Sequence, residues 1–520
     1  MPGKPVEIGP WDGGLKNASG FGEFIEDNQA YLLQNFEVDT DGTLINRPAV
    51  AKATVTGVAA GLFGMRLLGT WIAADGTNLL VATSNYGIHI IDPSNSAVVF
   101  THTMTAPRCY VSFDGILDVV PMVAGQGGAI SKSGAIYTWT GYAAIPTGIS
   151  AVLYKDRMYI AQETASRIVY SDVNNFSVWP ATNNVSIGFD NKQPLKAMIV
   201  VGSDVFLFKS DSTYRYGHAG DPAKAELKQT DAYVGTVNET TIAVYNNNTV
   251  YTLSNNAVYE LYQGTYTCIS KDLDMVRVVE PLNQVNFGVS VAADRLFIRF
   301  YTHMYVLSLL TQKWSEWTFV DSIKQFAKVV SLPGHEPNDD YMYMAANRLT
   351  GDNRFLNYFQ DSRILGIDKE AFTCKLITKS FDFQTPTYYK TILMGGLSVA
   401  CSSVVKISAV VPGSAVIEQL TWGEAFVQYT WGDAYDLGLT WGTAVTSDGD
   451  VLMKTTIPPT DGSAFGRKLL KCLGKFRYRQ VQFVIEIPAS YNDRASFSVK
   501  LYNLTVYALQ KETIVASVTP

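Results

Sequence analysis

A short apolar run, Asp204-Val205-Phe206-Leu207-Phe208, is followed after a polar turn by a second run, Ser212-Thr213-Tyr214-Arg215-Tyr216. The first run occurs seven times in similar form, at steps of 38 to 48 residues, with copies that begin at Asn78, Asp118, Asp156, Asp204, Asn248, Asp294 and Asp340. A strand–turn–strand period of about 40–50 residues is typical of β-propeller blades. The repeat therefore predicts a large, rigid all-β platform. Such platforms bind other molecules more often than they catalyse reactions.

The composition is consistent with a protein that makes extensive contacts. The 520 residues leave room for two or more domains. Charged residues make up 17%, against a usual share of about 25%, and there are 29 Tyr and 25 Phe. Subunit interfaces are poor in charge and rich in aromatic residues, but β-strands favour the same aromatic residues. Both explanations remain open at this point.

Charge, cysteine usage and hydropathy exclude several classes of protein. The net charge of −6 excludes a basic nucleic-acid binder. The five cysteines have no metal-binding spacing, and isolated thiols favour folding in a reducing cytoplasm. We also expect no membrane span, because no apolar stretch approaches the roughly 18 residues that a span requires.

Three parts are predicted along the chain. Residues 1–54 are expected to form an extended N-terminal arm, with a short helical turn near 26–34. Residues 55–368 contain the repeats and are expected to form a six- or seven-bladed β-propeller. Longer strands begin near residue 370, so residues 369–520 are predicted to form a C-terminal β-sandwich with an insertion at 413–450.

No catalytic, metal or cofactor site is predicted. The histidines share no motif, and no nucleophile elbow or phosphate-binding loop is present. The Asp and Asn residues that open the repeated strands are interpreted as turn residues that bond their own backbone. Asp39-Thr40-Asp41-Gly42 resembles the start of a calcium loop but lacks the closing Glu, so a turn is predicted there.

Two segments contain candidate interaction residues. The insertion holds three Trp-Gly turns, which either present exposed aromatic anchors or pack against one another, at Trp422, Trp431 and Trp441. A basic segment either meets a phosphate backbone, forms a solvated strand face or pairs with acidic groups of a neighbouring subunit. Its residues are Arg467, Lys468, Lys471, Lys475, Arg477 and Arg479.

The N-terminal region resembles a signature of tailed-bacteriophage tail proteins. The resemblance covers Trp11-Asp12-Gly13-Gly14-Leu15-Lys16-Asn17 and Asn35-Phe36-Glu37-Val38-Asp39-Thr40-Asp41-Gly42-Thr43-Leu44-Ile45-Asn46-Arg47-Pro48. Residues 205–217 and 473–483 are also similar to stretches of that family. The layout of the remaining chain is similar to the tail nozzle, or hub, of short-tailed phages, in which a β-propeller is joined to a β-domain.

This resemblance implies a structural, non-enzymatic virion protein that is made in the host cytoplasm and located in the tail. Such a protein forms a homohexameric ring around the DNA ejection channel and passes DNA without sequence-specific binding. Its partners are neighbouring tail or adaptor proteins and the tail fibres or spikes, the receptor-binding proteins that it mounts. One alternative is a tail-tip host-binding protein of a long-tailed phage. A second is a propeller glycan hydrolase, which would need two carboxylates about 5–10 Å apart in a cleft.

Overall fold

The computed structural model describes twenty-four segments of the chain. They are residues 6–17, 26–48, 51–54, 66–84, 87–94, 97–105, 109–121, 123–188, 191–231, 233–254, 257–273, 288–292, 294–300, 303–318, 330–332, 341–346, 355–360, 372–381, 389–401, 403–410, 451–457, 466–471, 482–488 and 499–511. Within these segments the chain is all-β, and its one helical element is a single 3-10 turn, Pro222–Lys224. None of the segments contains a helix long and apolar enough to cross a membrane.

Seven four-stranded antiparallel units follow one another in the described part of the chain. Blade 1 has β7 (Arg66–Ile72), β8 (Asn78–Ser84), β9 (Gly87–Asp92) and β10 (Ala97–Thr103). Blade 2 has β11 (Cys109–Phe113), β12 (Ile116–Val120), β13 (Gly128–Ser133) and β14 (Ile136–Gly141). Blade 3 has β15 (Ser150–Tyr154), β16 (Arg157–Gln162), β17 (Arg167–Tyr170) and β18 (Asn184–Ser186).

The next four units continue the same meander. Blade 4 has β19 (Leu195–Val201), β20 (Asp204–Lys209), β21 (Thr213–Gly217) and β22 (Glu226–Asp231). Blade 5 has β23 (Ile242–Tyr245), β24 (Thr249–Ser254), β25 (Ala257–Tyr262) and β26 (Thr265–Cys268). Blade 6 has β27 (Gly288–Ala292), β28 (Arg295–Phe300), β29 (His303–Ser308) and β30 (Lys313–Thr318). Blade 7 has β31 (Val330–Leu332), β32 (Tyr341–Ala346), β33 (Phe355–Gln360) and β6 (Ala51–Thr54).

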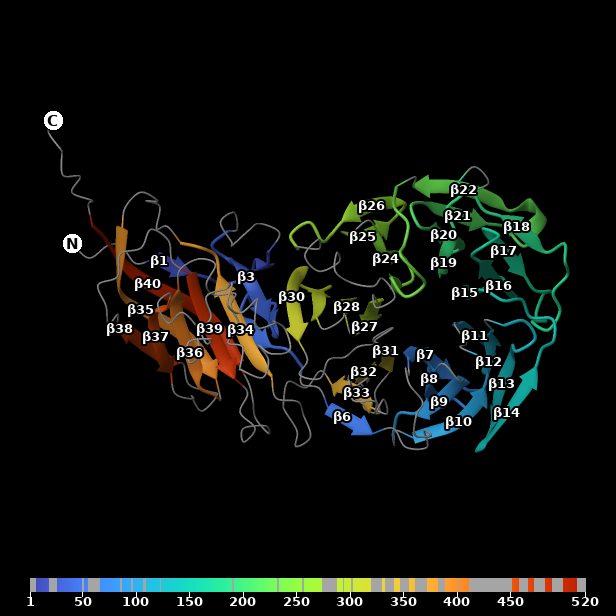
Figure 1. Cartoon of the computed structure of the whole chain (residues 1–520), viewed down its shortest axis with the longest axis horizontal. Helices are drawn as coiled ribbons and strands as arrows, with labels where there is room; N and C mark the ends of the chain where they lie inside the picture. Colours follow the sequence, from blue (N-terminus) through green and yellow to red (C-terminus); the bar gives the residue numbers. More distant parts are fainter. Residues whose placement is uncertain are drawn as a thin grey trace, which may run out of the picture.

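The blades close into a ring (Figure 1). The first strand of each blade contacts the first strand of the next blade, and β31 of blade 7 contacts β7 of blade 1. The propeller prediction is therefore confirmed, and the number of blades is seven. The repeated run found in the sequence is the second strand of each blade, which has neighbours on both sides and is mostly buried, as in β8 and β24.

Blade 7 takes its fourth strand from the N-terminal side of the propeller. β6 precedes β7 in the sequence, but it pairs with β33 in antiparallel register, Phe355 opposite Thr54. The last blade is thus completed by the segment that leads into the first one, which joins the two ends of the ring. Residues 51–54 belong to the propeller and not to the predicted arm.

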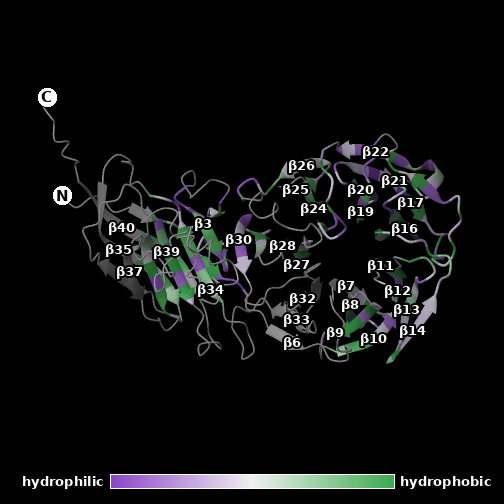
Figure 2. Ribbon diagram, viewed as in Figure 1, coloured by the Kyte–Doolittle hydropathy of each residue, from purple (hydrophilic) through white to green (hydrophobic). Residues whose placement is uncertain are grey.

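The C-terminal domain is a two-sheet β-sandwich (Figure 1). One sheet has β38 (Gly466–Lys471), β35 (Tyr389–Cys401), β40 (Val499–Lys511), β5 (Leu44–Asn46) and β4 (Phe36–Val38), with β1 (Val6–Ile8) on β40. The other has β3 (Gln29–Gln34), β34 (Thr373–Thr378), β39 (Gln482–Pro488), β36 (Val405–Val410) and β37 (Val451–Ile457), with β2 (Gly14–Leu15) on β3. Leu397 and Leu504 of the first sheet and Leu376 and Ile485 of the second share one buried core, and Figure 2 shows the hydrophobic colouring along β34 and β39.

The predicted extended arm is therefore wrong for residues 6–17 and 26–48. Their strands enter both sheets of the sandwich, so this segment is part of the second domain. The helical turn expected near 26–34 is also wrong, because Gln29–Gln34 is strand β3. A β-bulge between Ala30 and Leu32 puts the buried residues Ala30 and Leu33 three positions apart, a spacing that imitates a helix.

Candidate functional site

The segment that resembles phage tail proteins forms the junction between the propeller and the sandwich. Strand β3 lies between β30 of blade 6 and β34 of the sandwich, with Gln34 opposite Glu316, so one sheet runs through both domains. Asn35 follows with a left-handed φ of 58°, and its backbone N–H donates to the Glu316 carbonyl over 2.7 Å. Asn is among the few non-glycine residues that adopt this conformation readily.

The buried Asn35 amide connects three elements. Its Nδ2 donates to Thr318 Oγ1 of blade 6 over 3.0 Å and to the Thr373 carbonyl of the sandwich over 2.8 Å. Its Oδ1 accepts from the Thr318 N–H and from Arg47 Nε, both over 2.9 Å. This uses the full hydrogen-bonding capacity of a side-chain amide.

Two buried arginines complete the junction, and each has hydrogen-bond partners that compensate for the burial of its charge. Arg47 also donates to the Pro48 carbonyl (2.9 Å) and the Thr318 carbonyl (3.2 Å), and its guanidinium lies 4.0 Å from the centre of the Phe372 ring. Arg295 of blade 6 donates to both carboxylate oxygens of Glu37 on β4, over 2.7 and 3.2 Å. Bidentate pairing is the geometry that makes an arginine–carboxylate contact specific.

The turn between β4 and β5 uses the carboxylates of the calcium-like sequence. Asp41 Oδ1 accepts from the Thr43 N–H and hydroxyl, and Asp39 Oδ1 accepts from the Thr40 N–H. Gly42 has a φ of 80°, as this tight turn requires. The turn prediction is confirmed.

A second candidate site lies on the propeller. The loops between first and second strands and between third and fourth strands emerge on one face of the ring, which we call the turn face. Seven of the ten exposed large hydrophobic side chains in the described residues lie there, namely Ile72, Ile116, Ile136, Val173, Val178, Tyr262 and Leu310. They come from five different blades, and exposed apolar residues spread in this way are ordinary on a protein surface.

Hydrogen bonds connect neighbouring turns on this face from blade 3 to blade 6. The Tyr154 hydroxyl of blade 3 donates to the Ser203 carbonyl of blade 4 over 2.8 Å, and the Gly202 N–H of blade 4 donates to the Asn247 carbonyl of blade 5 over 3.0 Å. The Tyr245 hydroxyl of blade 5 donates to Asp294 Oδ1 of blade 6 over 2.8 Å. The expectation that Asp204 and Asp294 bond their own backbone is wrong, because their carboxylates accept from Arg215 and Tyr245.

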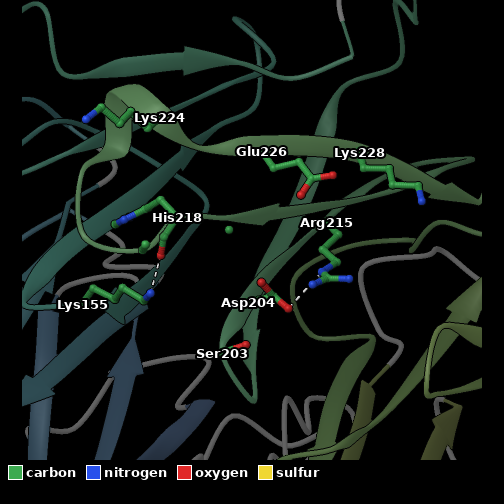
Figure 3. Close-up of a pocket in the computed structure, with 10 residues that line it drawn as sticks. Lys155, Ser203, Asp204, Arg215, His218, Lys224, Glu226 and Lys228 are labelled. Atoms are coloured by element: carbon green, nitrogen blue, oxygen red, sulfur yellow. Dashed lines mark hydrogen bonds and ion pairs between the residues drawn. The ribbon is translucent and has the colours of Figure 1, made fainter.

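A cavity of about 370 Å³ lies at the turn face of blades 3 and 4 (Figure 3). Four cationic side chains line it, and two carboxylates, Asp204 and Glu226, face the same space. Arg215 Nε donates to Asp204 Oδ2 over 2.9 Å, and Lys155 donates to the His218 carbonyl. The cations are Lys155, Arg215, Lys224 and Lys228, so the lining has an excess of positive charge.

His218 adds no charge to this cavity. The Gly220 N–H donates to its Nδ1 over 3.2 Å, so the proton of the neutral ring is on Nε2, which donates to the Tyr159 hydroxyl over 2.8 Å. Burial, together with the charges of Lys155 and Arg157, lowers the pKa of His218. The His218 imidazole is therefore an uncharged part of the cavity lining.

An adjoining cavity of about 390 Å³ lies between blades 4 and 5 and shares Ser203, Asp204 and Arg215 with the first. Its walls combine apolar and amide groups. Phe206, Leu261 and Tyr262, the last 45% exposed, supply the apolar surface. The amides come from the turns of blade 5, at Asn247, Asn248 and Gln263.

The residues predicted from the sequence lie elsewhere. Arg467, Lys468 and Lys471 are on β38, the edge strand beside β35 in the sandwich, and the structure describes their backbone only. The other candidates lie outside the described residues, namely Trp422, Trp431, Trp441, Lys475, Arg477 and Arg479. The turn-face cavities were not predicted from the sequence, although the alternation of Glu226, Leu227 and Lys228 marks an outer strand with a charged face.

In the described residues no group of three or more His, Cys, Asp or Glu is arranged to hold a metal ion. No protein-family model matches the chain, and no curated protein sequence matches it significantly. Among solved structures, the chain is similar to BamB from Moraxella catarrhalis, at 11% identity and a TM-score of 0.38 over 63% of this chain and 96% of that one. It is also similar to the Pan2 WD40 domain of Neurospora crassa, at 7% identity and a TM-score of 0.38 over 61% and 95%. Similarities this weak say nothing about function, and the seven-bladed assignment rests on the sheets themselves.

Proposed function

We propose that this chain is a structural component of a bacteriophage tail, the ring-forming nozzle or hub that contributes to the DNA ejection channel and mounts receptor-binding proteins. One observation carries the proposal. The N-terminal segment that resembles the tail family supplies the buried side chains that join the propeller to the sandwich, Asn35, Glu37 and Arg47. A propeller joined to a β-domain is also the layout that the resemblance implies.

The junction suits a subunit of a stiff assembly. A ring subunit has to keep its two domains in one relative orientation while DNA passes. A shared sheet and a buried bidentate ion pair oppose bending at the joint, because bending would separate Arg295 from Glu37 and leave each charge buried without its partner.

The charge of the chain also suits a DNA channel. A net charge of −6 disfavours adhesion of a polyanion, so DNA would pass without being held. A channel lined with Lys and Arg in the assembled ring would contradict this part of the proposal.

The native mass of the purified protein at several concentrations, combined with negative-stain images, tests the proposal. Closed rings of six subunits are expected. A protein that stays monomeric at every concentration, and also when mixed with the other tail proteins of its phage, would contradict the ring.

The alternatives make different predictions in the same preparation. A tail-tip host-binding protein would be a monomer or trimer that adsorbs to host cells. A glycan hydrolase would release reducing ends from host polysaccharide, and its activity would be lost in Asp204→Asn and Glu226→Gln, the two carboxylates of the turn-face cavity.

A further inference from the structure

We propose that the two adjoining turn-face cavities of blades 3 to 5 together bind an acidic oligosaccharide, with a uronic-acid carboxylate among the cations and a neighbouring sugar ring on Tyr262. This inference concerns a binding site and does not depend on ring formation. The two cavities, of about 370 and 390 Å³, each fall within the range of about 300–1,000 Å³ that is usual for ligand sites.

The charge pattern of blade 4 leaves a place for one anionic group. Arg215 on β21 lies directly opposite Lys228 on β22, and like charges in this position repel. Asp204 neutralises Arg215, but Lys228 is exposed and makes no ion pair with any described residue. Lys228 is therefore the cation that is left to donate a charge-assisted hydrogen bond to a ligand carboxylate.

The two carboxylates of the same cavity fit the hydroxyl groups of a sugar. Glu226 lies opposite Gly217, and Asp204 directly precedes Val205, the residue opposite Tyr216, so the two carboxylates flank Gly217. An alanine Cβ at position 217 would collide with Asp204 Oδ1, so the glycine leaves room for this carboxylate above the strand. Ionised carboxylates only accept hydrogen bonds, and sugar hydroxyls are donors.

The second cavity has the surfaces that a pyranose ring requires. Tyr262 and Phe206 offer aromatic area, against which the C–H face of a sugar packs. Asn247, Asn248 and Gln263 present amide groups that both donate to and accept from hydroxyls. The shared wall of Ser203, Asp204 and Arg215 places the acid group and the adjacent ring in neighbouring cavities.

A glycan fits this lining better than a DNA strand does. The phosphodiester backbone of DNA has no hydroxyl groups within the strand to donate to the carboxylates of Asp204 and Glu226, and these carboxylates repel its phosphates. A uronic acid carries its one carboxylate among hydroxyls that can donate to Asp204 and Glu226. The hydrogen bonds between turns also hold the walls in place before binding, which reduces the ordering cost.

Isothermal titration calorimetry of the full chain tests the site, with tetragalacturonic acid as the acidic probe and maltotetraose as the neutral one. We expect measurable binding of the acidic probe and weaker binding of the neutral one. Lys228→Ala should weaken the acidic probe about tenfold or more and leave the neutral probe unchanged, because one charge-assisted hydrogen bond is lost. Tyr262→Ala should weaken both probes about tenfold, because the aromatic surface is lost.

Two matched variants serve as controls. Lys192 is exposed on the connection between blades 3 and 4, and Tyr233 is 81% exposed on the connection between blades 4 and 5, both at the opposite ends of the strands from the turn face. Lys192→Ala and Tyr233→Ala should bind both probes as the unaltered chain does.

Several outcomes would overturn the site. These are no heat with the acidic probe, equal affinity for the two probes, unchanged acidic binding in Lys228→Ala, or tighter binding of a single-stranded oligodeoxynucleotide than of the acidic probe. The native mass is measured on the same samples. Glycan binding by a protein that never forms rings would support the site and count against the nozzle, and rings that bind no glycan would do the reverse.

Discussion

Gly14 shows how a single residue of the N-terminal Gly-Gly-Leu segment serves the junction. It has a φ of 73°, and a Cβ there would lie 3.0 Å from Lys313 Cβ and 3.3 Å from the Trp314 carbonyl oxygen. The absence of a side chain therefore lets β2 approach β30 of blade 6. Gly76 has a similar φ of 81°, but nothing lies within 4 Å of its Cβ position.

Gly14→Ala should destabilise the chain more than Gly76→Ala. Both variants incur the cost of a left-handed alanine, about 1–2 kcal/mol, but only Gly14→Ala adds a close contact, worth about 1–3 kcal/mol more. Thermal unfolding measures the difference in Tm. Equal losses in the two variants would show that the close approach of β2 contributes nothing.

His89 gives the stability a pH dependence. It lies buried in blade 1 between Ser84 Oγ (2.9 Å from Nε2) and Thr101 Oγ1 (3.1 Å from Nδ1), and burial lowers its pKa to about 4. The unfolded chain, with an ordinary histidine pKa near 6.5, binds the proton first as the pH falls. This contribution is therefore complete above pH 6.5 and is lost progressively between 6.5 and 4.

Between pH 7 and pH 5 the loss due to His89 should be about 2 kcal/mol. The variant His89→Gln keeps a polar side chain that does not titrate, so its Tm should fall less over this interval than that of the unaltered chain. Parallel profiles of Tm against pH for the two proteins would contradict a His89 that is buried and neutral in the folded chain. Measurements at several pH values, with ionic strength held constant, provide the comparison.

At the scale of elements, β6 closes the propeller by pairing with β33 only, so it is an edge strand. In such a strand, successive N–H groups point alternately to the partner strand and away from it. Proline removes an N–H and is tolerated only where the group points away. Lys52 and Ala53 are adjacent residues of β6, opposite Asn357 and Leu356.

Lys52→Pro and Ala53→Pro should therefore differ, and each serves as the control for the other. The variant that removes a ladder hydrogen bond should lower the Tm of the chain, and the other should be close to neutral. Hydrogen exchange of blade 7 amides should rise in the destabilised variant alone. Equal behaviour of the two prolines would contradict closure of the ring by β6.

For the whole molecule, the continuous sheet from blade 6 into the sandwich predicts that the two domains unfold together. β27 to β30 continue through β3 into β34, β39, β36 and β37. Asn35→Ala leaves buried donors of Arg47 and Thr318 without their acceptor, and it also puts an alanine at a φ of 58°. The substitution therefore weakens the joint between the two domains more than it weakens either domain.

Differential scanning calorimetry should show one transition for the unaltered chain and two for Asn35→Ala. The matched control is Glu163→Gln, which removes a half-exposed ion pair with Lys196 within the propeller and should leave the single transition intact. Two transitions in the unaltered chain would show that the shared sheet does not couple the domains.

The all-β class and the blade repeat follow from local sequence. Each repeated run and the turn that follows it are determined by residues close together in the sequence. The second strand of each of the seven blades could therefore be recognised along the chain. Hairpins such as β15–β16, with Lys155 and Asp156 at positive φ, are likewise local. The junction motif could be found as a resemblance, but its role could not.

Long-range pairing decided the rest. Blade 7 is closed by the pairing of β6 with β33. The residues predicted to form an arm are strands of the sandwich, because β1 and β5 pair with β40 near the other end of the chain and β4 pairs with β5. Asn35 meets Thr318 across 283 residues, and Tyr262 meets Phe206 at a cavity only because blades 4 and 5 are neighbours. A strand pairs through backbone groups that are the same in every residue, so its sequence reveals that it is a strand but not which strand it will lie beside.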